Sequence, residues 1–349
     1  MASGIPFIPE IPPELRAAAQ IGKLVPFIGS GVSVLAGCPN WRELAAQALM
    51  PFVTAGKFSY GKYHQLTEVY SVHGGAEIPA VHPRVQLSIA LRLQTATGIA
   101  IPYEQILHPG EGLKKPEGRK IYSDICKLAH AHVTTNYDKW SDFKFAVPEL
   151  AVGPGVGTQQ ADRTPDVDEE RIYIYDRTKF LPAALVAGSV VHLHGSVRDP
   201  DSMVLAQRDY LNLYANDRNF KDPTEENLVL TFLHHLFLLK TVLFMGYGAE
   251  ELEILEYVIS KSRYVRGSRP EKKHYMLQGF EPDQEERFEV LNDYYAELGI
   301  MVLPFRVDHR GIGWKQLGVV IENFAKEMPA STPMVAQGLI EMESFLERG

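Results

Sequence analysis

The segment FIGSGVSVLAGCPNWR, residues 27–42, connects a short apolar run to a stretch with helical periodicity. In such a strand-to-helix turn, glycines at 29 and 31 let the backbone approach a pyrophosphate closely and leave amide N–H groups directed at it. These two glycines alone are equally well explained by a tight turn without a ligand. Residues 37–42 (GCPNWR) then add a second turn, an aromatic ring and a cation at a fixed distance downstream.

The rest of the chain alternates apolar runs with segments of helical periodicity. The runs predicted as buried strands are Leu24–Ile28, Ala131–Thr135, Val190–His194, Val242–Gly246, His274–Gln278 and Ile300–Phe305. The predicted helices include Trp41–Val53, Glu225–Leu239, Glu250–Ser260, Gln284–Leu298 and Trp314–Glu327. This alternation is typical of an α/β fold with a Rossmann-like, doubly wound and mostly parallel sheet, which binds ligands beyond the carboxyl ends of its strands.

Two segments interrupt this pattern within a single predicted domain of residues 1–330. Residues 54–118 carry helical periodicity, clearest at Val85–Thr97, but no good strand, and they predict a helical insertion. Residues 141–189 are rich in glycine, proline and acids and predict a long loop or lid with at most one hairpin. Residues 331–349 predict one more amphipathic helix, a candidate for packing on a partner subunit.

Polar residues follow three of the predicted strands. Asn136 and Asp138 come after the second strand, where such residues are most often turn formers. His194 ends the third strand beside Gly195, and a lone histidine there is ordinarily a satisfied structural group. The segment GYGAEE, residues 246–251, follows the fourth. Because the carboxyl ends of parallel strands share one edge of a sheet, these residues are expected near the glycine-rich turn.

Taken in order, the four segments resemble the motifs of the sirtuins. Residues 29–42 match the spacing of G-A-G-I-S-x-x-x-G-I-P-x-F-R, with Ser30, Val32, Cys38 and Trp41 as substitutions. Residues 134–138 (TTNYD) are similar to T-Q-N-I-D, with Thr135 in place of the glutamine. Residues 194–195 match H-G, and residues 246–251 resemble G-Y-S-x-x-D of sirtuin-like proteins, with Glu251 at the aspartate position. The resemblance extends weakly to about residue 310.

The resemblance implies an NAD site in which the nicotinamide–ribose bond is cleaved. Asn136 would hold a ribose hydroxyl or a water, and His194, with an ordinary pKa near 6.5, would act as the base. Asn40 and Asp138 would hold the carboxamide, while Trp41 and Arg42 would border the phosphates and the ribose. The remaining residues expected to contact NAD are Gly29, Ser30, Gly31, Ser33, Pro39, Thr135, Gly246, Tyr247, Gly248 and Glu251. For Glu251, capping of the following helix is the simpler explanation.

The cysteine content separates this chain from the deacylase sirtuins. Those enzymes carry a zinc module held by two C-x-x-C pairs, whereas this chain has only Cys38 and Cys126. We therefore expect no zinc and favour an NAD glycohydrolase, with NAD as substrate, similar to the sirtuin-like enzymes of bacterial antiviral defence. A zinc-free deacylase, an ADP-ribosyltransferase and a non-catalytic module that senses NAD or ADP-ribose remain as alternatives.

Composition and charge limit which kinds of partner and compartment we expect. The 349 residues have the make-up of an ordinary globular protein, and the net charge of -8 argues against direct nucleic-acid binding. Neither a signal peptide nor a membrane span is predicted, so we expect a cytoplasmic protein. A defence NADase must stay silent until infection. The resemblance therefore implies control by homo-oligomerisation or by a partner such as a HerA-type ATPase or a short Argonaute.

Overall fold

The computed structural model of the chain describes residues 4–71, 77–79, 81–145, 168–214, 227–247 and 274–331. Within this part of the chain, seven strands form a parallel sheet in the order β11-β10-β9-β1-β4-β8-β7. The strands are β1 (Leu24–Ile28), β4 (His132–Thr134), β7 (Ile172–Ile174), β8 (Ser189–His192), β9 (Thr241–Met245), β10 (His274–Phe280) and β11 (Ile300–Arg306). The predicted α/β fold with a parallel, Rossmann-like sheet is confirmed, and each of the six predicted strands is present.

The order of the strands places a switch point at β1. From β1 the chain moves to β4, forms β7 and β8 on that side, and then crosses to β9 on the other side of β1. In the register, Phe27 of β1 lies between Val133 of β4 and Phe244 of β9. The connections after β1 and β9 therefore leave in different directions at the carboxyl edge, which is where sheets of this kind bind ligands.

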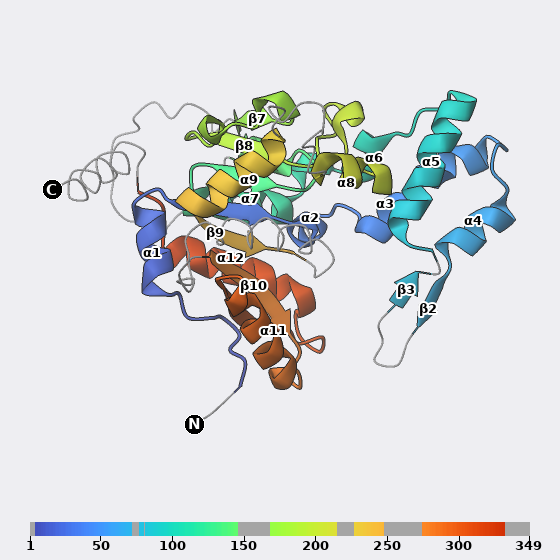
Figure 1. Cartoon of the computed structure of the whole chain (residues 1–349). Helices are drawn as coiled ribbons and strands as arrows, with labels where there is room; N and C mark the ends of the chain where they lie inside the picture. The colour runs from blue at the N-terminus through green and yellow to red at the C-terminus, as the bar shows by residue number, and fades with distance from the viewer. Residues whose placement is uncertain are drawn as a thin grey trace, which may run out of the picture.

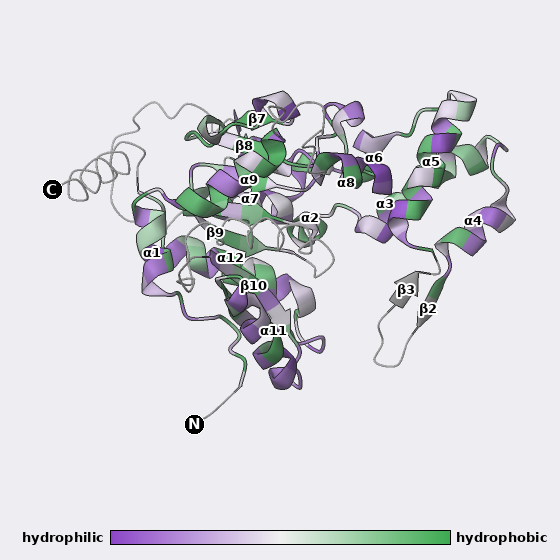
Figure 2. Cartoon of the chain, in the orientation of Figure 1, coloured by the Kyte–Doolittle hydropathy of each residue, from purple (hydrophilic) through white to green (hydrophobic). Residues whose placement is uncertain are grey.

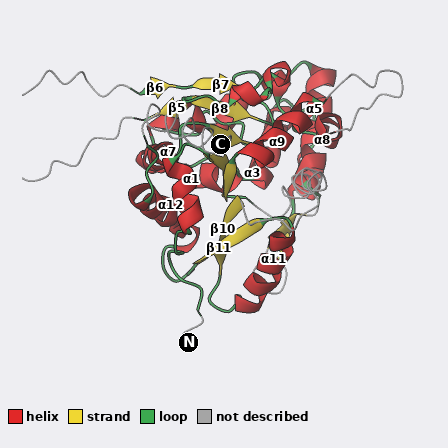
Figure 3. Ribbon diagram, turned by 60° about the vertical axis from the view of Figure 1, so that its left-hand side comes forward, coloured by secondary structure: helices red, strands yellow, loops and turns green. Residues whose placement is uncertain are grey.

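Helices cover both faces of the sheet, as Figures 1 and 3 show. One face carries α1 (Pro13–Gln20), α7 (Pro116–Leu128) and α12 (Gln316–Glu327), and the other carries α8 (Gln207–Tyr214), α9 (Leu228–Leu239) and α11 (Glu285–Glu297). Alternation along β1 divides its side chains between the two cores, with Val25 and Phe27 on the α9 side and Leu24 and Ile28 on the α12 side. Both faces of β1 are thus buried, which explains its uninterrupted apolar sequence.

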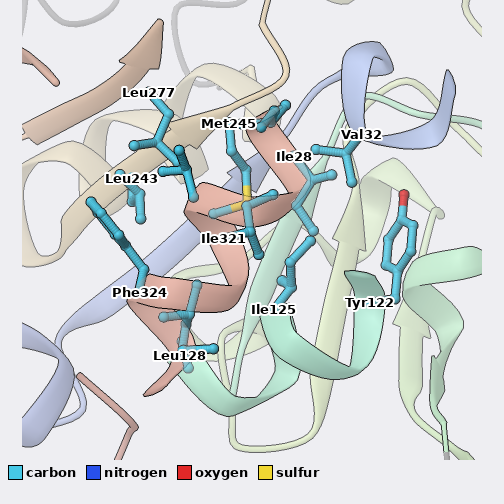
Figure 4. Packing of buried hydrophobic residues seen from close by; sticks show 14 of the residues in the cluster. Ile28, Val32, Tyr122, Ile125, Leu128, Leu243, Met245, Leu277, Ile321 and Phe324 are labelled. Atoms are coloured by element: carbon cyan, nitrogen blue, oxygen red, sulfur yellow. The ribbon is translucent and has the colours of Figure 1, made fainter. Parts of the chain in front are cut away.

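The core on the α12 side joins the sheet to the glycine-rich turn. Figure 4 shows Ile321 and Phe324 of α12 packed against Leu243 and Met245 of β9, with Tyr122 of α7 beside Val32. Figure 2 shows the same organisation as hydrophobic residues along the central strands and hydrophilic ones on the outer surface of α11. The turn between β1 and α2 (Ser30–Leu35), the short helix that follows it, is therefore packed against a buried apolar core.

A helical module extends from the sheet at its carboxyl edge, to the right in Figure 1. It contains α3 (Trp41–Thr54), α4 (Tyr60–Thr67), α5 (Pro83–Thr97) and α6 (Tyr103–Leu107), which enclose a third hydrophobic core. The predicted insertion is thus helical, but the prediction that it holds no strand was wrong: β2 (Val69–Ser71) pairs antiparallel with β3 (Glu77–Pro79). These three-residue strands lack the long apolar run by which a buried strand is recognised.

The segment predicted as a long loop at 141–189 contributes a strand to the main sheet. Its described residues include a short antiparallel pair, β5 (Phe143–Lys144) with β6 (Glu169–Glu170), followed by β7 at the sheet edge. β7 escaped prediction because it is short and half exposed, Ile172 being 57% exposed. The remaining short elements are α2 (Ser30–Leu35) and the 3-10 turns Gly112–Lys114, Trp140–Asp142, Arg177–Lys179, Pro182–Ala184, Pro200–Ser202 and Gly313–Lys315.

Several predicted features lie outside the described residues: the helix Glu250–Ser260, the site residues Gly248 and Glu251, and the tail helix beyond Ser331.

None of the helices in the described ranges is both long and apolar enough to cross a bilayer.

The close packing of the glycine-rich turn against β9 predicts a large effect of Gly246→Ala. Gly246 has φ +69°, and a Cβ there would lie 2.5 Å from the Val32 backbone nitrogen. Gly56 is the matched control, because it has φ +67° and an added Cβ would meet no atom of the described chain within 4 Å. Gly56→Ala should lower the free energy of unfolding by about 1–2 kcal/mol through backbone strain alone. Gly246→Ala should lower it by about 1–3 kcal/mol more. Equal losses in urea denaturation would contradict this.

Candidate active site

The glycine-rich turn is held to the end of β9 by backbone hydrogen bonds. The Gly29 N–H donates to the Met245 carbonyl at 2.9 Å, and the Gly31 N–H donates to the Gly246 carbonyl at 2.8 Å. A Cβ at Gly29 would lie 2.6 Å from the Gly246 carbonyl oxygen. The glycines at 29 and 31 therefore serve close packing between two strand ends. The expectation that their amides point at a pyrophosphate is corrected, because both N–H groups are already bonded within the protein.

Asn136 lies next to this turn with nearly all of its hydrogen-bonding groups engaged. Its side-chain Nδ2 donates to the Gly29 carbonyl at 2.9 Å and to the Ser33 hydroxyl at 2.7 Å. Its backbone N–H donates to Thr134 Oγ1 at 3.0 Å, and Thr134 Oγ1 in turn donates to the Ile28 carbonyl. Both amide hydrogens are thus used to orient the side chain, and the amide oxygen is the group left to accept a hydrogen bond from a ligand.

Ser33 connects Asn136 to a buried carboxylate. The Ser33 hydroxyl donates to Asp138 Oδ2 at 2.5 Å, and Asp138 Oδ1 accepts the Trp140 N–H at 3.0 Å. Because the single Ser33 proton goes to Asp138, the Tyr122 hydroxyl at 3.1 Å must donate to Ser33 Oγ. Burial, reinforced by Asp138, raises the pKa of Tyr122 well above its usual range and keeps this donor protonated. The direction of every proton in the network is therefore determined by the acceptor-only carboxylate.

A small cavity of about 30 Å³ opens beside Asn136 and Asp138. Its other lining residues are Ser30, Ser33, Cys38, Pro39, Trp41, Leu44, Leu107, Thr135 and Tyr137. The volume is sufficient for about one or two water molecules. Burial, with Asp138 adding to it, raises the pKa of Cys38 far above its ordinary value, so the thiol stays neutral and does not serve as a nucleophile. The cavity thus offers an amide, a carboxylate and apolar walls.

The predicted residues around this centre divide between ligand-facing and structural positions. Trp41 lines the cavity and contacts Tyr137 edge-on at 5.8 Å. Asn40 is the N-cap of α3, in a capping box with Glu43, so its side-chain oxygen already accepts a hydrogen bond from the helix. Thr135 hydrogen-bonds the Tyr247 hydroxyl at 2.9 Å, which joins the ends of β4 and β9. Ser30 and Pro39 lie at the cavity, and Arg42 begins α3 beside Trp41.

His194 is buried at the same edge but does not line the cavity. Its Nε2 is 2.8 Å from the Tyr214 hydroxyl, and its ring packs edge-on against Tyr210 at 5.0 Å. Both tyrosines belong to α8, and Arg84 of α5 lies over the Tyr210 ring at 4.1 Å. His194 Nδ1 is buried and has no hydrogen-bond partner among the described residues. The predicted pair of catalytic residues is thus at one sheet edge, with His194 covered by α8 and α5.

The environment of His194 changes its acid–base properties. Burial, together with the positive charges of Arg84 and Arg177, lowers the pKa of His194 to about 3. The expectation of an ordinary pKa near 6.5 is therefore corrected. A neutral imidazole has the lone pair that a base needs, but so low a pKa makes it a weak one. In this arrangement, His194 becomes an effective base only if the contact with Tyr214 opens and water or substrate reaches it.

Several residues that build this site were absent from the sequence predictions. Tyr122 lies on α7 and Tyr214 on α8, and neither belongs to a motif at a strand end. His192 is fully buried, with hydrogen bonds to Asn136 and Asp142. His192 and His194 are two residues apart, so alternation along a strand places them on the same face and could not distinguish their roles. They diverge because β8 ends at His192 and the chain turns at Gly195, whose φ is +82°.

The described residues contain no grouping of three or more histidine, cysteine or acidic side chains suited to hold a metal ion. Residues 130–299, just under half of the chain, match the family model of the SIR2-like domain. This match supports a SIR2-like family, whose members are in general NAD-dependent enzymes. It covers Asn136, Asp138, His194 and Gly246, whereas the glycine-rich turn lies before it. The curated proteins provide no match to the chain.

Removing the hydroxyl that links Asn136 to Asp138 should destabilise the protein. In Ser33→Ala, the Asn136 amide, Asp138 and Tyr122 each lose a buried partner, so the free energy of unfolding should fall by about 2–4 kcal/mol. Ser88→Ala is the matched control, because that hydroxyl only donates to the Arg84 carbonyl of its own helix. Denaturant unfolding of both variants tests this, and a Ser33→Ala loss as small as that of the control would contradict the network.

The lowered pKa of His194 predicts a pH-dependent stability. Between pH 6.5 and about 3, the unfolded chain protonates this histidine and the folded chain does not. The stability that the neutral His194 gives the folded protein is therefore complete above pH 6.5 and decreases as the pH falls below that value. From pH 7 to pH 5, wild type should lose about 2 kcal/mol more than His194→Gln does in urea denaturation. Identical pH slopes for the two proteins would mean that His194 is protonated normally in the folded state.

Proposed function

We propose that this protein is an NAD glycohydrolase, which cleaves the nicotinamide–ribose bond of NAD with water to give ADP-ribose, nicotinamide and a proton. One observation carries the proposal: Asn136, whose two amide hydrogens are both bonded within the protein so that its amide oxygen is left to accept, lines a small cavity together with Asp138. The SIR2-like match over residues 130–299 supports NAD as the substrate.

Asn136 acts on the ribose or on the attacking water. Its amide oxygen accepts a hydrogen bond from a ribose hydroxyl or from that water, and both are donors. Since Gly29 and Ser33 fix the amide, little reorganisation is needed when the substrate binds. The rigid placement of a reacting group is where much of the rate enhancement of such a site originates.

Asp138 supplies a fixed negative charge. Nicotinamide leaves as a neutral molecule, so positive charge builds on the ribose carbon as the bond breaks. A buried carboxylate whose oxygens already accept hydrogen bonds from Ser33 and Trp140 stabilises such a charge without rearranging. This role differs from the one that the resemblance implied for Asp138, which was to hold the carboxamide.

His194 acts as the base once α8 releases it. The bond to Tyr214 and the burial of the ring hold His194 neutral and away from the cavity. Such an arrangement supports an enzyme that is silent by default, as an NAD-depleting effector of antiviral defence must be. We propose that self-association, or a partner such as a HerA-type ATPase or a short Argonaute, supplies the trigger that moves α8.

The assay that tests the proposal follows the products of NAD. Protein brought to its assembled state, by self-association or with its partner, should release ADP-ribose and nicotinamide from NAD, resolved by chromatography, with no requirement for an acetylated peptide. Asn136→Ala should lower kcat by about 100- to 1,000-fold, and His194→Ala should lower it as well. Asn323→Ala, at a half-buried asparagine on α12, is the control that should keep wild-type turnover.

Other outcomes would identify the alternatives. Acyl transfer from the peptide to ADP-ribose would indicate a zinc-free deacylase, and transfer of ADP-ribose to a protein would indicate a transferase. Binding of NAD in calorimetry without turnover, both alone and after trigger-induced assembly, would indicate a sensing module. Wild-type turnover in both Asn136→Ala and His194→Ala would remove these residues from the reaction.

A further inference from the structure

His192 is a fully buried histidine whose two ring nitrogens both face hydrogen-bond acceptors. Nδ1 is 3.0 Å from the carbonyl oxygen of Asn136, and Nε2 is 2.7 Å from Asp142 Oδ1. A carbonyl and a carboxylate accept hydrogen bonds and have none to give, so both ring nitrogens must donate. A histidine that donates from both nitrogens is an imidazolium.

The charges around this ring favour its cationic form. Asp142 also accepts from Arg198 Nε at 2.6 Å, and Arg198 reaches Glu170 at 2.8 Å and lies over the Tyr173 ring. Asp138 is the other carboxylate that acts on the ring. Burial lowers the pKa of His192, but Asp142 and the hydrogen bonds outweigh it, so the pKa is raised. His192 and Arg198 thus face three carboxylates, Asp142, Asp138 and Glu170.

Neutralising Asp142 does not require His192. Arg198 already makes a charge-assisted bond with the Asp142 carboxylate, and a buried ion pair is in itself weak evidence for a stabilising role. What His192 adds is the hydrogen bond from its Nδ1 to the carbonyl oxygen of Asn136. With Thr134 on the backbone N–H and Gly29 and Ser33 on the side chain, this bond completes the support of Asn136.

We propose that His192 is a positioning residue: as an imidazolium anchored on Asp142, it holds the carbonyl of Asn136 and so directs the Asn136 amide oxygen into the cavity. His192 touches no substrate in this proposal, and its catalytic consequence rests on the glycohydrolase function proposed above. The linked groups come from the end of β8, the turn after β4 and the loop after β8, which bears Arg198.

Two isosteric variants separate the two hydrogen bonds. The asparagine amide nitrogen occupies the place of histidine Nδ1, so His192→Asn can still donate to the Asn136 carbonyl. The glutamine amide nitrogen reaches the place of Nε2, so His192→Gln can still donate to Asp142 and leaves the Asn136 carbonyl without its donor. If His192 positions Asn136, His192→Gln should lower kcat by about 100-fold, and His192→Asn should restore most of that loss. Thermal melting of each variant corrects for the fraction folded.

A second readout is independent of NAD turnover. In protein labelled with 15N at histidine and asparagine, both His192 ring nitrogens should remain protonated above the ordinary histidine pKa of about 6.5, and Asp142→Asn should shift their deprotonation to lower pH. The side-chain amide signals of Asn136 should move in His192→Gln and stay near their wild-type positions in His192→Asn. These signals report the position of Asn136 even if the chain proves not to cleave NAD.

The results that would overturn the proposal are specific. An unprotonated His192 ring nitrogen at pH 7 would show that His192 is not an imidazolium. Asn136 amide signals that move equally in the two variants, or kcat values that fall equally after correction for folding, would leave His192 as a structural residue only. If wild type cleaves no NAD either alone or after trigger-induced assembly, while the Asn136 amide signals shift as expected, the glycohydrolase function is overturned and the positioning role stays supported.

Discussion

The Ser33 hydroxyl is the interaction on which the site depends, because it is the point where three parts of the fold meet. It accepts from the Asn136 amide after β4 and from Tyr122 on α7, and it donates to Asp138. A hydroxyl has one proton, so its donation to the carboxylate determines the direction of every other bond in the group. The glycines at 29 and 31 make this meeting possible, since any larger residue would separate the turn bearing Ser33 from the end of β9.

The helical module is joined to this network through the residue between its two polar members. Tyr137 packs in the third core with Trp41 and donates from its hydroxyl to the Val204 carbonyl, while its neighbours Asn136 and Asp138 face the cavity. A displacement of α3 or α5 would therefore move the backbone segment that holds Asn136 and Asp138. The same module carries Arg84, which lies over Tyr210 beside His194. Coupling between the module and the site thus has two physical contacts.

The fold was predictable for strands that are buried on both faces of the sheet. The site was predictable only for residues in a motif at the end of a strand. Continuous apolar runs such as Leu24–Ile28 must be covered on both faces, which predicts the parallel sheet directly. β7 and the β2–β3 pair are short or half exposed and leave no such pattern. Tyr122 and Tyr214 reach the site from helices whose position depends on tertiary packing. Asn40 was interpreted as a ligand contact because helix capping and ligand binding use the same residue type at the same strand-to-helix turn.

Two histidines separated by one residue end in opposite electrostatic conditions, and the cause is their partners and not their burial. His192 meets a carboxylate and a carbonyl and is held as a cation. His194 meets a tyrosine hydroxyl, and burial together with the positive charges of two arginines lowers its pKa to about 3. The charged histidine needs no motion to keep Asn136 in place. The neutral one has a buried Nδ1 with no hydrogen-bond partner in the described chain, and its other nitrogen is hydrogen-bonded to Tyr214 of α8. A charged histidine that supports Asn136 and a neutral histidine covered by α8 are therefore built from neighbouring residues of one strand end.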